Sequence, residues 1–225
     1  MADVKERLLD AALAHVAFDG WSDLAFEAAC EDADVDLATA RAVCPKGALD
    51  LAGAYHKRGD ALMLARMDQA QDMKVREKVT FAVRARIEAI DDKEAVRRGT
   101  TLFTLPQNAT EGARLIWGTA DAIWTALGDS SDDVNWYTKR MILGGVYSAT
   151  VLFWLGDDSD DTAATWEFLD RRINDVMQFE KVKAQVRENP VLKGLFAGPN
   201  WLLSRVKAPN QTPRRDMPGH WPRNT

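Results

Sequence analysis

The chain has 225 residues, of which 46% are hydrophobic and 28% charged, so it can bury the core of one large domain, or of one with a small appendage. Its first residues, Met-Ala-Asp-Val-Lys-Glu-Arg, contain neither the apolar segment of a secretory signal nor an Arg- and Ser-rich transit sequence. We therefore expect a cytoplasmic protein, bacterial or already processed. The two cysteines, Cys30 and Cys44, are expected to be buried free thiols rather than a disulfide scaffold.

Charge is distributed unevenly around the net value of −5. Residues 1–54 carry 4 basic and 11 acidic side chains, whereas residues 180–225 carry 9 basic and 3 acidic ones. The acidic N-terminal part repels polyanions. The basic C-terminal part can meet an anionic membrane, an acidic partner or a nucleic acid.

Helical periodicity runs through the chain, and no alternating strand pattern of useful length interrupts it. Gly20 closes the first expected helix, and Ser22 and Asp36 cap the next two. The expected helices cover approximately residues 4–18, 22–30, 36–43, 46–73, 75–91, 93–103, 108–128 and 132–156, then a ninth from about 160 and a last segment at about 190–206. This pattern predicts an all-α protein of about ten helices.

The first three expected helices are long, short and short, as in a helix-turn-helix. The run Arg7-Leu8-Leu9-Asp10-Ala11-Ala12-Leu13, followed by Asp19-Gly20-Trp21, resembles the opening of a TetR-type repressor. DNA-reading helices need cations for the phosphates, and this region offers Arg41. Against it stand the acidic residues Glu27, Glu31, Asp32, Asp34 and Asp36. We interpret residues 1–50 as a degenerate helix-turn-helix region that binds no nucleic acid, with a TetR-type ligand-responsive regulator as the alternative function.

Residues 141–156 contain no charge and are apolar on every helical face, so the segment must be surrounded by protein or by lipid. It is shorter than the about 20 residues that cross a bilayer, which favours a buried central helix. Its small-residue patch, formed by Gly144, Gly145, Ser148 and Ala149, permits either close helix packing or open space. Sequence reasoning leaves both alternatives open.

Apolar positions are densest in the helices at about 93–103, 108–128 and 132–156, which also carry glycines that leave room. We expect these helices to bound a ligand cavity. The expected lining residues are Phe103, Leu115, Ile116, Met141, Tyr147, Val151 and Phe153.

Two aromatic residues, Trp136 and Tyr137, stand in the first turns of the uncharged helix, beside Lys139 and Arg140. Solvent is near at this point, so we predict that both rings are exposed. Exposed Trp and Tyr together are typical of a binding hot spot. We expect Trp136→Ala to weaken partner binding with little loss of stability.

No residue pattern points to catalysis. None of the three histidines follows a glutamate by three positions, which excludes the usual Glu-x-x-His di-iron site. The histidines and cysteines have no zinc spacing, and the sequence contains neither a phosphate-binding Gly-rich loop nor a nucleophile elbow. We predict a protein that is not an enzyme and that holds no metal and no cofactor.

The segment from Pro190 to Val206 combines apolar residues with the cations Lys193, Arg205 and Lys207. An amphipathic helix of this kind lies in a membrane interface. The residues expected to bind the membrane are Leu192, Leu195, Phe196, Trp201 and Leu202. Because Gly198-Pro199 breaks the helix, the alternative is that the segment packs on its own domain or on a second subunit.

Several blocks of the chain resemble the lipid-binding accessory proteins of ubiquinone (coenzyme Q) biosynthesis, over approximately residues 4–205. These blocks are Asn135-Trp136-Tyr137-Thr138-Lys139-Arg140, Tyr147, Thr165-Trp166-Glu167-Phe168-Leu169, Leu105-Pro106-Gln107-Asn108 and the stretch from His15 to Trp21. The resemblance implies a TetR-like helical fold that has lost DNA binding, with a lipid-binding bundle over residues 51–185 and a membrane-binding helix and tail over residues 186–225.

The resemblance also implies a function. A protein of this family binds an isoprenoid or phospholipid and presents a polyprenyl quinone precursor to the membrane-associated di-iron hydroxylase of the pathway. We also expect a homodimer, which is common among TetR-like folds. It would act as a peripheral protein on the inner face of the bacterial membrane. The family's partner-binding patch carries over to Trp136 and Tyr137, and we include Asn135 and Arg140 beside them.

Overall fold

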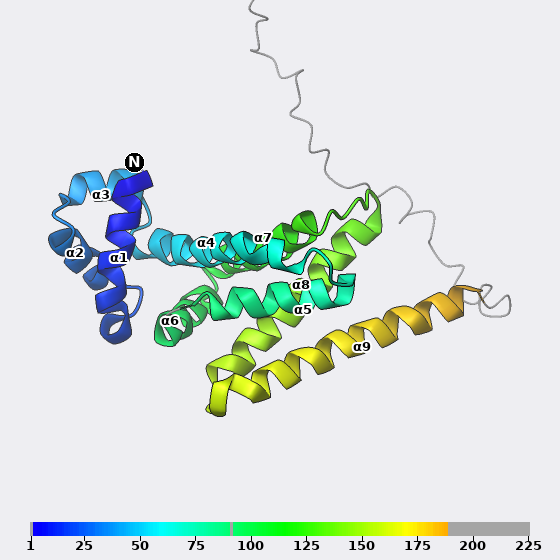
Figure 1. Cartoon of the computed structure of the whole chain (residues 1–225). Coiled ribbons are helices and arrows are strands. Elements are labelled where there is room, and N and C mark those ends of the chain that lie inside the picture. The colour runs from blue at the N-terminus through cyan, green and yellow to red at the C-terminus, as the bar shows by residue number, and fades with distance from the viewer. Residues whose placement is uncertain (1, 91, 189–225) are drawn as a thin grey trace, which may run out of the picture.

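The protein is described by a computed structural model that covers the backbone of residues 2–90 and 92–188 and the side chains of residues 3–90 and 92–178 (Figure 1). Over this part of the chain nine α-helices and two short 3-10 helices form, and no strand. The elements are α1 (Ala2–Asp19), α2 (Asp23–Asp32), α3 (Leu37–Val43), α4 (Ala48–Arg66), η1 (Met67–Ala70), α5 (Val75–Glu88), α6 (Lys93–Thr104), α7 (Ala109–Ala126), α8 (Val134–Leu155), η2 (Asp160–Thr162) and α9 (Ala163–Glu188). The predicted all-α fold is confirmed.

The predicted cap residues set the first helix boundaries. Gly20 adopts a φ of 67°, a left-handed conformation that ends α1 without steric cost. The Ser22 hydroxyl accepts a hydrogen bond from the backbone N–H of Ala25 at 3.2 Å, and the Asp36 carboxylate accepts one from Thr39 at 2.9 Å. Each bond satisfies an N–H group that a helix start leaves unpaired.

Two apolar cores lie along the molecule. The first joins α1, α2 and α3 to the beginnings of α4 and α6, and includes Leu8, Phe26 and Leu51. Cys30 and Cys44 are buried there as free thiols, as predicted. The second core packs α4, α5, α7, α8 and α9 together around Met63, Ile123 and Leu169. Figure 1 shows α1–α3 grouped at one end and the long α9 lying along the opposite side of the bundle.

The uncharged helix α8 is buried on one side only. Leu143, Val146 and Leu155 belong to the second core, but Met141 is 62% exposed and Leu152 59% exposed. The expectation that this helix is surrounded on every face is therefore wrong for the single chain. None of the helices within the described residues is long and apolar enough to cross a membrane.

The two glycines of α8 play different parts. A Cβ atom at Gly144 would lie 3.2 Å from Cγ2 of Ile116, so this glycine permits α8 to pack closely on α7. A Cβ atom at Gly145 would meet nothing within 4 Å, and this glycine lies on the exposed side. Close packing and open space thus occur at adjacent positions, and the open space faces outward.

The predicted membrane-binding residues Leu192, Leu195, Phe196, Trp201 and Leu202 lie outside the described residues, as does the last of the ten expected helices.

Candidate functional site

A largely apolar cavity of about 480 Å³ lies between α4, α5, α6, α7 and α8, and Trp21 of the α1–α2 turn closes one side. Its volume falls within the roughly 300–1,000 Å³ typical of small-molecule sites. Its apolar wall consists of Trp21, Ala52, Ile90, Ala95, Val96, Gly99, Phe103, Ala109, Gly112, Ala113, Leu115, Ile116, Val151 and Leu152. The arrangement can hold an apolar ligand between the two cores.

Five of the seven residues predicted to line a cavity do line this one: Phe103, Leu115, Ile116, Tyr147 and Val151. The expected positions of Met141 and Phe153 are wrong. Each is six residues from Tyr147, which at 3.6 residues per turn places it about 120° around the helix. Met141 points to solvent, and the Phe153 ring stacks on that of Phe168, with centroids 4.5 Å apart.

The cavity wall changes from apolar to polar at its most buried part. Arg86 is 2% exposed, and its Nε donates to Oδ1 of Asp60 over 2.6 Å while Nη2 donates to the carbonyl of His56 over 2.7 Å. Gly59 makes this possible, because a Cβ atom there would lie 2.4 Å from Nη1 of Arg86. The charge of Arg86 is therefore balanced inside the protein by Asp60.

Two further polar groups complete this cluster. The Thr119 hydroxyl donates to Oδ1 of Asp60 at 2.9 Å, which leaves its oxygen to accept a hydrogen bond from Nε2 of His56 at 2.8 Å. Burial, aided by Arg86, lowers the pKa of His56 to about 4, so its ring is neutral at pH 7. The Tyr147 ring meets that of His56 edge-on, with centroids 6.3 Å apart.

Sequence reasoning included Tyr147 in the cavity but missed His56, Asp60, Arg86 and Thr119. The spacing of His56 and Asp60, four residues apart on one helix, was a signal, because it places both on one face. The contribution of Arg86 comes from another helix, and no local pattern reveals it.

A second hollow, of about 510 Å³, lies between α1 and α4. Its lining includes Lys5, Glu6, Lys46, Asp50 and Arg58, and Arg58 pairs with Glu6 at 2.6 Å. Such a charged surface is unsuited to an apolar ligand.

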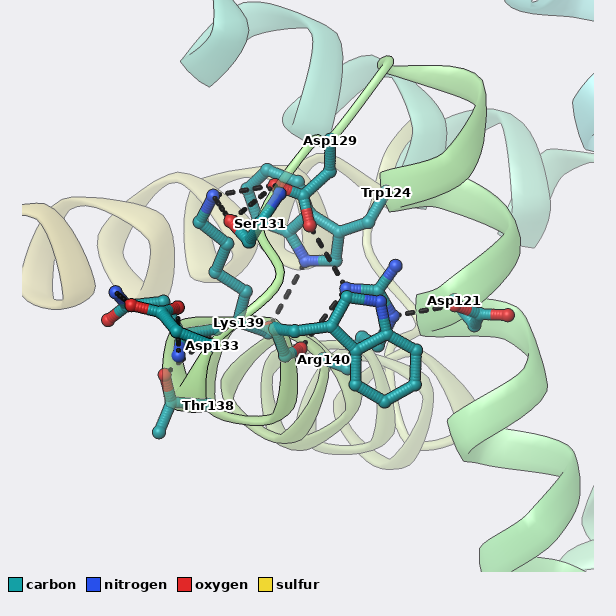
Figure 2. A network of polar contacts seen from close by, with 10 residues as sticks. Asp121, Trp124, Asp129, Ser131, Asp133, Thr138, Lys139 and Arg140 are labelled. Atoms are coloured by element: carbon teal, nitrogen blue, oxygen red, sulfur yellow. Dashed lines mark hydrogen bonds and ion pairs between the residues drawn. The ribbon is translucent and has the colours of Figure 1, made fainter. Parts of the chain in front are cut away.

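The predicted partner-binding residues lie at the corner between α7 and α8, where a buried polar network forms (Figure 2). Asp129 is at its centre and accepts hydrogen bonds from Nζ of Lys139 at 2.7 Å, from the Ser131 hydroxyl at 2.8 Å and from Nη1 of Arg140 at 3.0 Å. Burial raises the pKa of Asp129, but these three donors outweigh it and lower the pKa to about 2. The network fixes the start of α8 to the preceding loop.

Arg140 is the buried member of this corner. Its side chain is 1% exposed, its Nε donates to Asp121 at 2.6 Å, and its guanidinium lies 4.0 Å from the centre of the Trp136 ring. Such a side chain stabilises the fold and cannot contact a partner, so the prediction that Arg140 lies on the partner surface is wrong.

The predicted exposure of the two aromatic residues is wrong for Trp136, which is 9% exposed, whereas Tyr137 is half-buried. The Trp136 ring packs against Trp117, with centroids 5.7 Å apart, and against Tyr137 at 4.8 Å. The reason is that Trp136 lies one turn before Arg140 on the face that meets α7. Asn135 is half-buried, and its side-chain amide donates to Asp133 at 2.8 Å.

Within the described residues no group of three or more His, Cys, Asp or Glu side chains is arranged to hold a metal ion.

The sequence of this chain is similar to that of proteins of the COQ9 family. Residues 109–180 match the profile of the COQ9 family. The chain is 31% identical to the rat protein named ubiquinone biosynthesis protein COQ9, mitochondrial. The 193 aligned residues make up 82% of this chain and 62% of the rat protein. The human protein of the same name is 29% identical over 193 residues, 82% of this chain and 61% of that protein. The resemblance to the COQ9 family is confirmed.

The COQ9-like region of residues 109–180 contains α7, α8 and much of α9, and so includes one wall of the cavity and the whole α7–α8 corner. COQ9-A of Xenopus laevis is 38% identical over 97 residues, 42% of this chain and 31% of that protein. The chain spans 62%, 60% and 64% of the length of the rat, bovine and Xenopus tropicalis COQ9 proteins.

A TetR transcriptional regulator from Nitrosomonas europaea has a similar structure, with a TM-score of 0.62. The two chains are 17% identical, and the similarity covers 76% of this chain and 95% of the regulator. At this identity the likeness concerns the fold, and it confirms the predicted TetR-like architecture.

Proposed function

We propose that this protein is a non-catalytic lipid-binding accessory protein of ubiquinone biosynthesis. It binds a polyprenyl quinone precursor, or a related isoprenoid, in the cavity between α4 and α8 and delivers it to a membrane-associated hydroxylase. The observation that carries the proposal is an apolar cavity of about 480 Å³ in a chain similar to the COQ9 proteins. A prenyl chain strongly disfavours water, since each buried CH₂ group contributes about 0.8 kcal/mol.

Filling the cavity should abolish lipid binding. Ser148 lines the cavity from α8, and Ser148→Phe places a ring within it. We expect purified wild-type protein to carry co-purifying lipid, detected by native mass spectrometry and lipid extraction. Ser148→Phe should lose at least nine-tenths of this lipid, which corresponds to about 1.4 kcal/mol of lost binding free energy.

The matched control is Gly118→Phe on the neighbouring helix α7. Gly118 is exposed, and a Cβ atom there meets nothing within 4 Å, so the same ring is added outside the cavity. Gly145→Phe is unsuitable for filling the cavity, because Gly145 lies on the outer side of α8. Equal lipid content in wild type, Ser148→Phe and Gly118→Phe would contradict binding in this cavity.

The exposed apolar face of α8 supports the homodimer proposed for this protein. Met141 and the partly exposed Phe153 lie on it beside Gly145, and a second copy would remove them from water. The proposal also includes docking on the inner face of a membrane through residues 190–206, together with contact between the α7–α8 corner and the hydroxylase. On that corner the accessible positions are Asn135 and Tyr137, since Trp136 and Arg140 are buried.

The alternative function, a TetR-type regulator, has the fold similarity in its favour. The helices that would read DNA oppose it: residues 23–43 carry six acidic side chains and one basic side chain. That basic residue, Arg41, is paired with Asp23 at 2.9 Å. Phosphate binding needs free cations, and none of the described side chains of α2 and α3 supplies one.

We therefore expect no sequence-specific DNA binding by this protein. A gel-shift assay at low salt, with DNA from around its own gene, checks this expectation. A specific, salt-sensitive complex would favour the regulator instead.

A further inference from the structure

The Tyr147 hydroxyl is a polar group that the fold leaves unused. Tyr147 is 4% exposed, and its hydroxyl has no hydrogen-bond partner among the described residues. No side-chain oxygen or nitrogen sealed from solvent in this part of the chain lacks a partner, so the hydroxyl must still reach open space. The open space beside Tyr147 is the cavity that it lines.

The surroundings keep this hydroxyl a neutral donor. Burial raises the pKa of Tyr147, so the phenol keeps its proton at pH 7. Arg86 lies with Cζ 5.7 Å from the centre of the Tyr147 ring, and its charge is balanced by Asp60. His56, whose ring meets that of Tyr147, is neutral.

This cluster therefore has a hydrogen-bond donor but no unbalanced charge. A buried anion, such as a carboxylate or phosphate, requires an unpaired cation to offset its loss of hydration. A neutral carbonyl or hydroxyl oxygen requires one donor, and Tyr147 provides it.

The exposure of the lining residues distinguishes an open end of the cavity from a buried end. Thr104, Ala109 and Leu152 are exposed and mark its mouth, whereas Arg86 and Tyr147 are buried. A ligand that enters through this mouth reaches Tyr147 with its leading end, and its remaining length follows toward solvent or a membrane.

We propose that the Tyr147 hydroxyl binds a neutral ring oxygen of a prenylated quinone or phenol, so that the ring occupies the buried end of the cavity and the prenyl chain leaves by the mouth. This orientation rests on the proposed lipid-binding function and specifies how the ligand is held. The ring is shielded while bound, and it must leave the cavity before an enzyme can act on it.

The test compares Tyr147→Phe with wild type, using full-length protein and isothermal titration calorimetry. Three probes are used: a benzoquinone with a geranyl chain, a benzene ring with the same chain, and a short-chain diacylglycerol. Tyr147→Phe removes one oxygen that has no hydrogen-bond partner among the described residues, so the fold should be kept. We expect an about fivefold loss of affinity for the geranyl quinone, as for one hydrogen bond, and no change for the geranyl benzene.

Thr100→Val is the matched control, because it removes another hydroxyl from the cavity wall, on α6. It should leave the affinity for the quinone unchanged. If wild type binds none of the three probes, the proposed function and this orientation both fall. If wild type binds the quinone and Tyr147→Phe binds it equally well, the orientation alone is wrong. A loss confined to the diacylglycerol would assign the site to a glycerol ester and overturn the ring assignment.

A second measurement needs no variant. The infrared carbonyl band of the bound geranyl quinone should lie at lower frequency than in a hydrocarbon solvent, because a donor weakens the C=O bond. An unshifted carbonyl band in wild type would overturn the proposal even if Tyr147→Phe did not fold.

Discussion

Replacing Arg140 with methionine should lower the free energy of unfolding by about 3–5 kcal/mol, the usual cost of breaking a buried ion pair from one side. The Arg140 guanidinium is 1% exposed, donates to Asp129 and Asp121, and lies over the Trp136 ring. Methionine keeps much of the volume but leaves Asp129, which is 3% exposed, with one cation fewer. Urea denaturation followed by circular dichroism measures the change.

Lys139→Met is the matched control for this variant. Lys139 also binds Asp129, at 2.7 Å, but its side chain is 38% exposed. Water reaches the ammonium group of Lys139 and can take its place beside Asp129, so the expected loss is about 1–2 kcal/mol, well below that for Arg140. Equal losses for the two variants would show that burial of Arg140 does not determine its contribution.

The helix boundaries were predictable because they depend on neighbouring residues. Ser22 and Asp36 cap α2 and α3 through bonds to N–H groups three residues later, and Gly20 ends α1 by its own conformation. Such local signals act in the same way in any fold. The similarity to a TetR regulator then follows from the order of the helices rather than from DNA chemistry.

The site was predictable only in part, because its polar residues come together from distant segments. Arg86 meets Asp60 across 26 positions, and Thr119 meets Asp60 across 59. The cavity-lining residues of α8 were correct at Tyr147 and Val151, where apolar character coincides with the inner face. They were wrong at Met141 and Phe153, since a helix that is apolar all round does not reveal which side faces the core.

The burial of Trp136 was also not predictable from the neighbouring residues. Charged neighbours suggested that solvent was near, yet Arg140 turns inward because Asp129, upstream in the loop, provides a buried partner. The ring of Trp136 is then covered by Arg140 on one face and by Trp117 and Tyr137 around it. A charged residue that forms a buried ion pair does not indicate that its sequence neighbours are exposed to solvent.

Trp136→Ala should therefore destabilise the protein by about 3–5 kcal/mol, the range for removing a buried large aromatic side chain. This expectation reverses the one drawn from the sequence. The loss includes the contact with Arg140, since a cation over a desolvated indole contributes up to about 2 kcal/mol. Thermal and urea unfolding of the purified variant measure it.

Tyr137→Ala separates stability from partner binding. Tyr137 shares the aromatic cluster but is half-buried, so its loss should cost less than that of Trp136. If the α7–α8 corner contacts the hydroxylase, Tyr137→Ala should weaken that complex while the fold persists, whereas Trp136→Ala should weaken it in proportion to the unfolded fraction. If a fully folded Trp136→Ala variant no longer bound the hydroxylase, the Trp136 ring would have to contact the hydroxylase directly. That result would contradict the assignment of Trp136 to the protein interior.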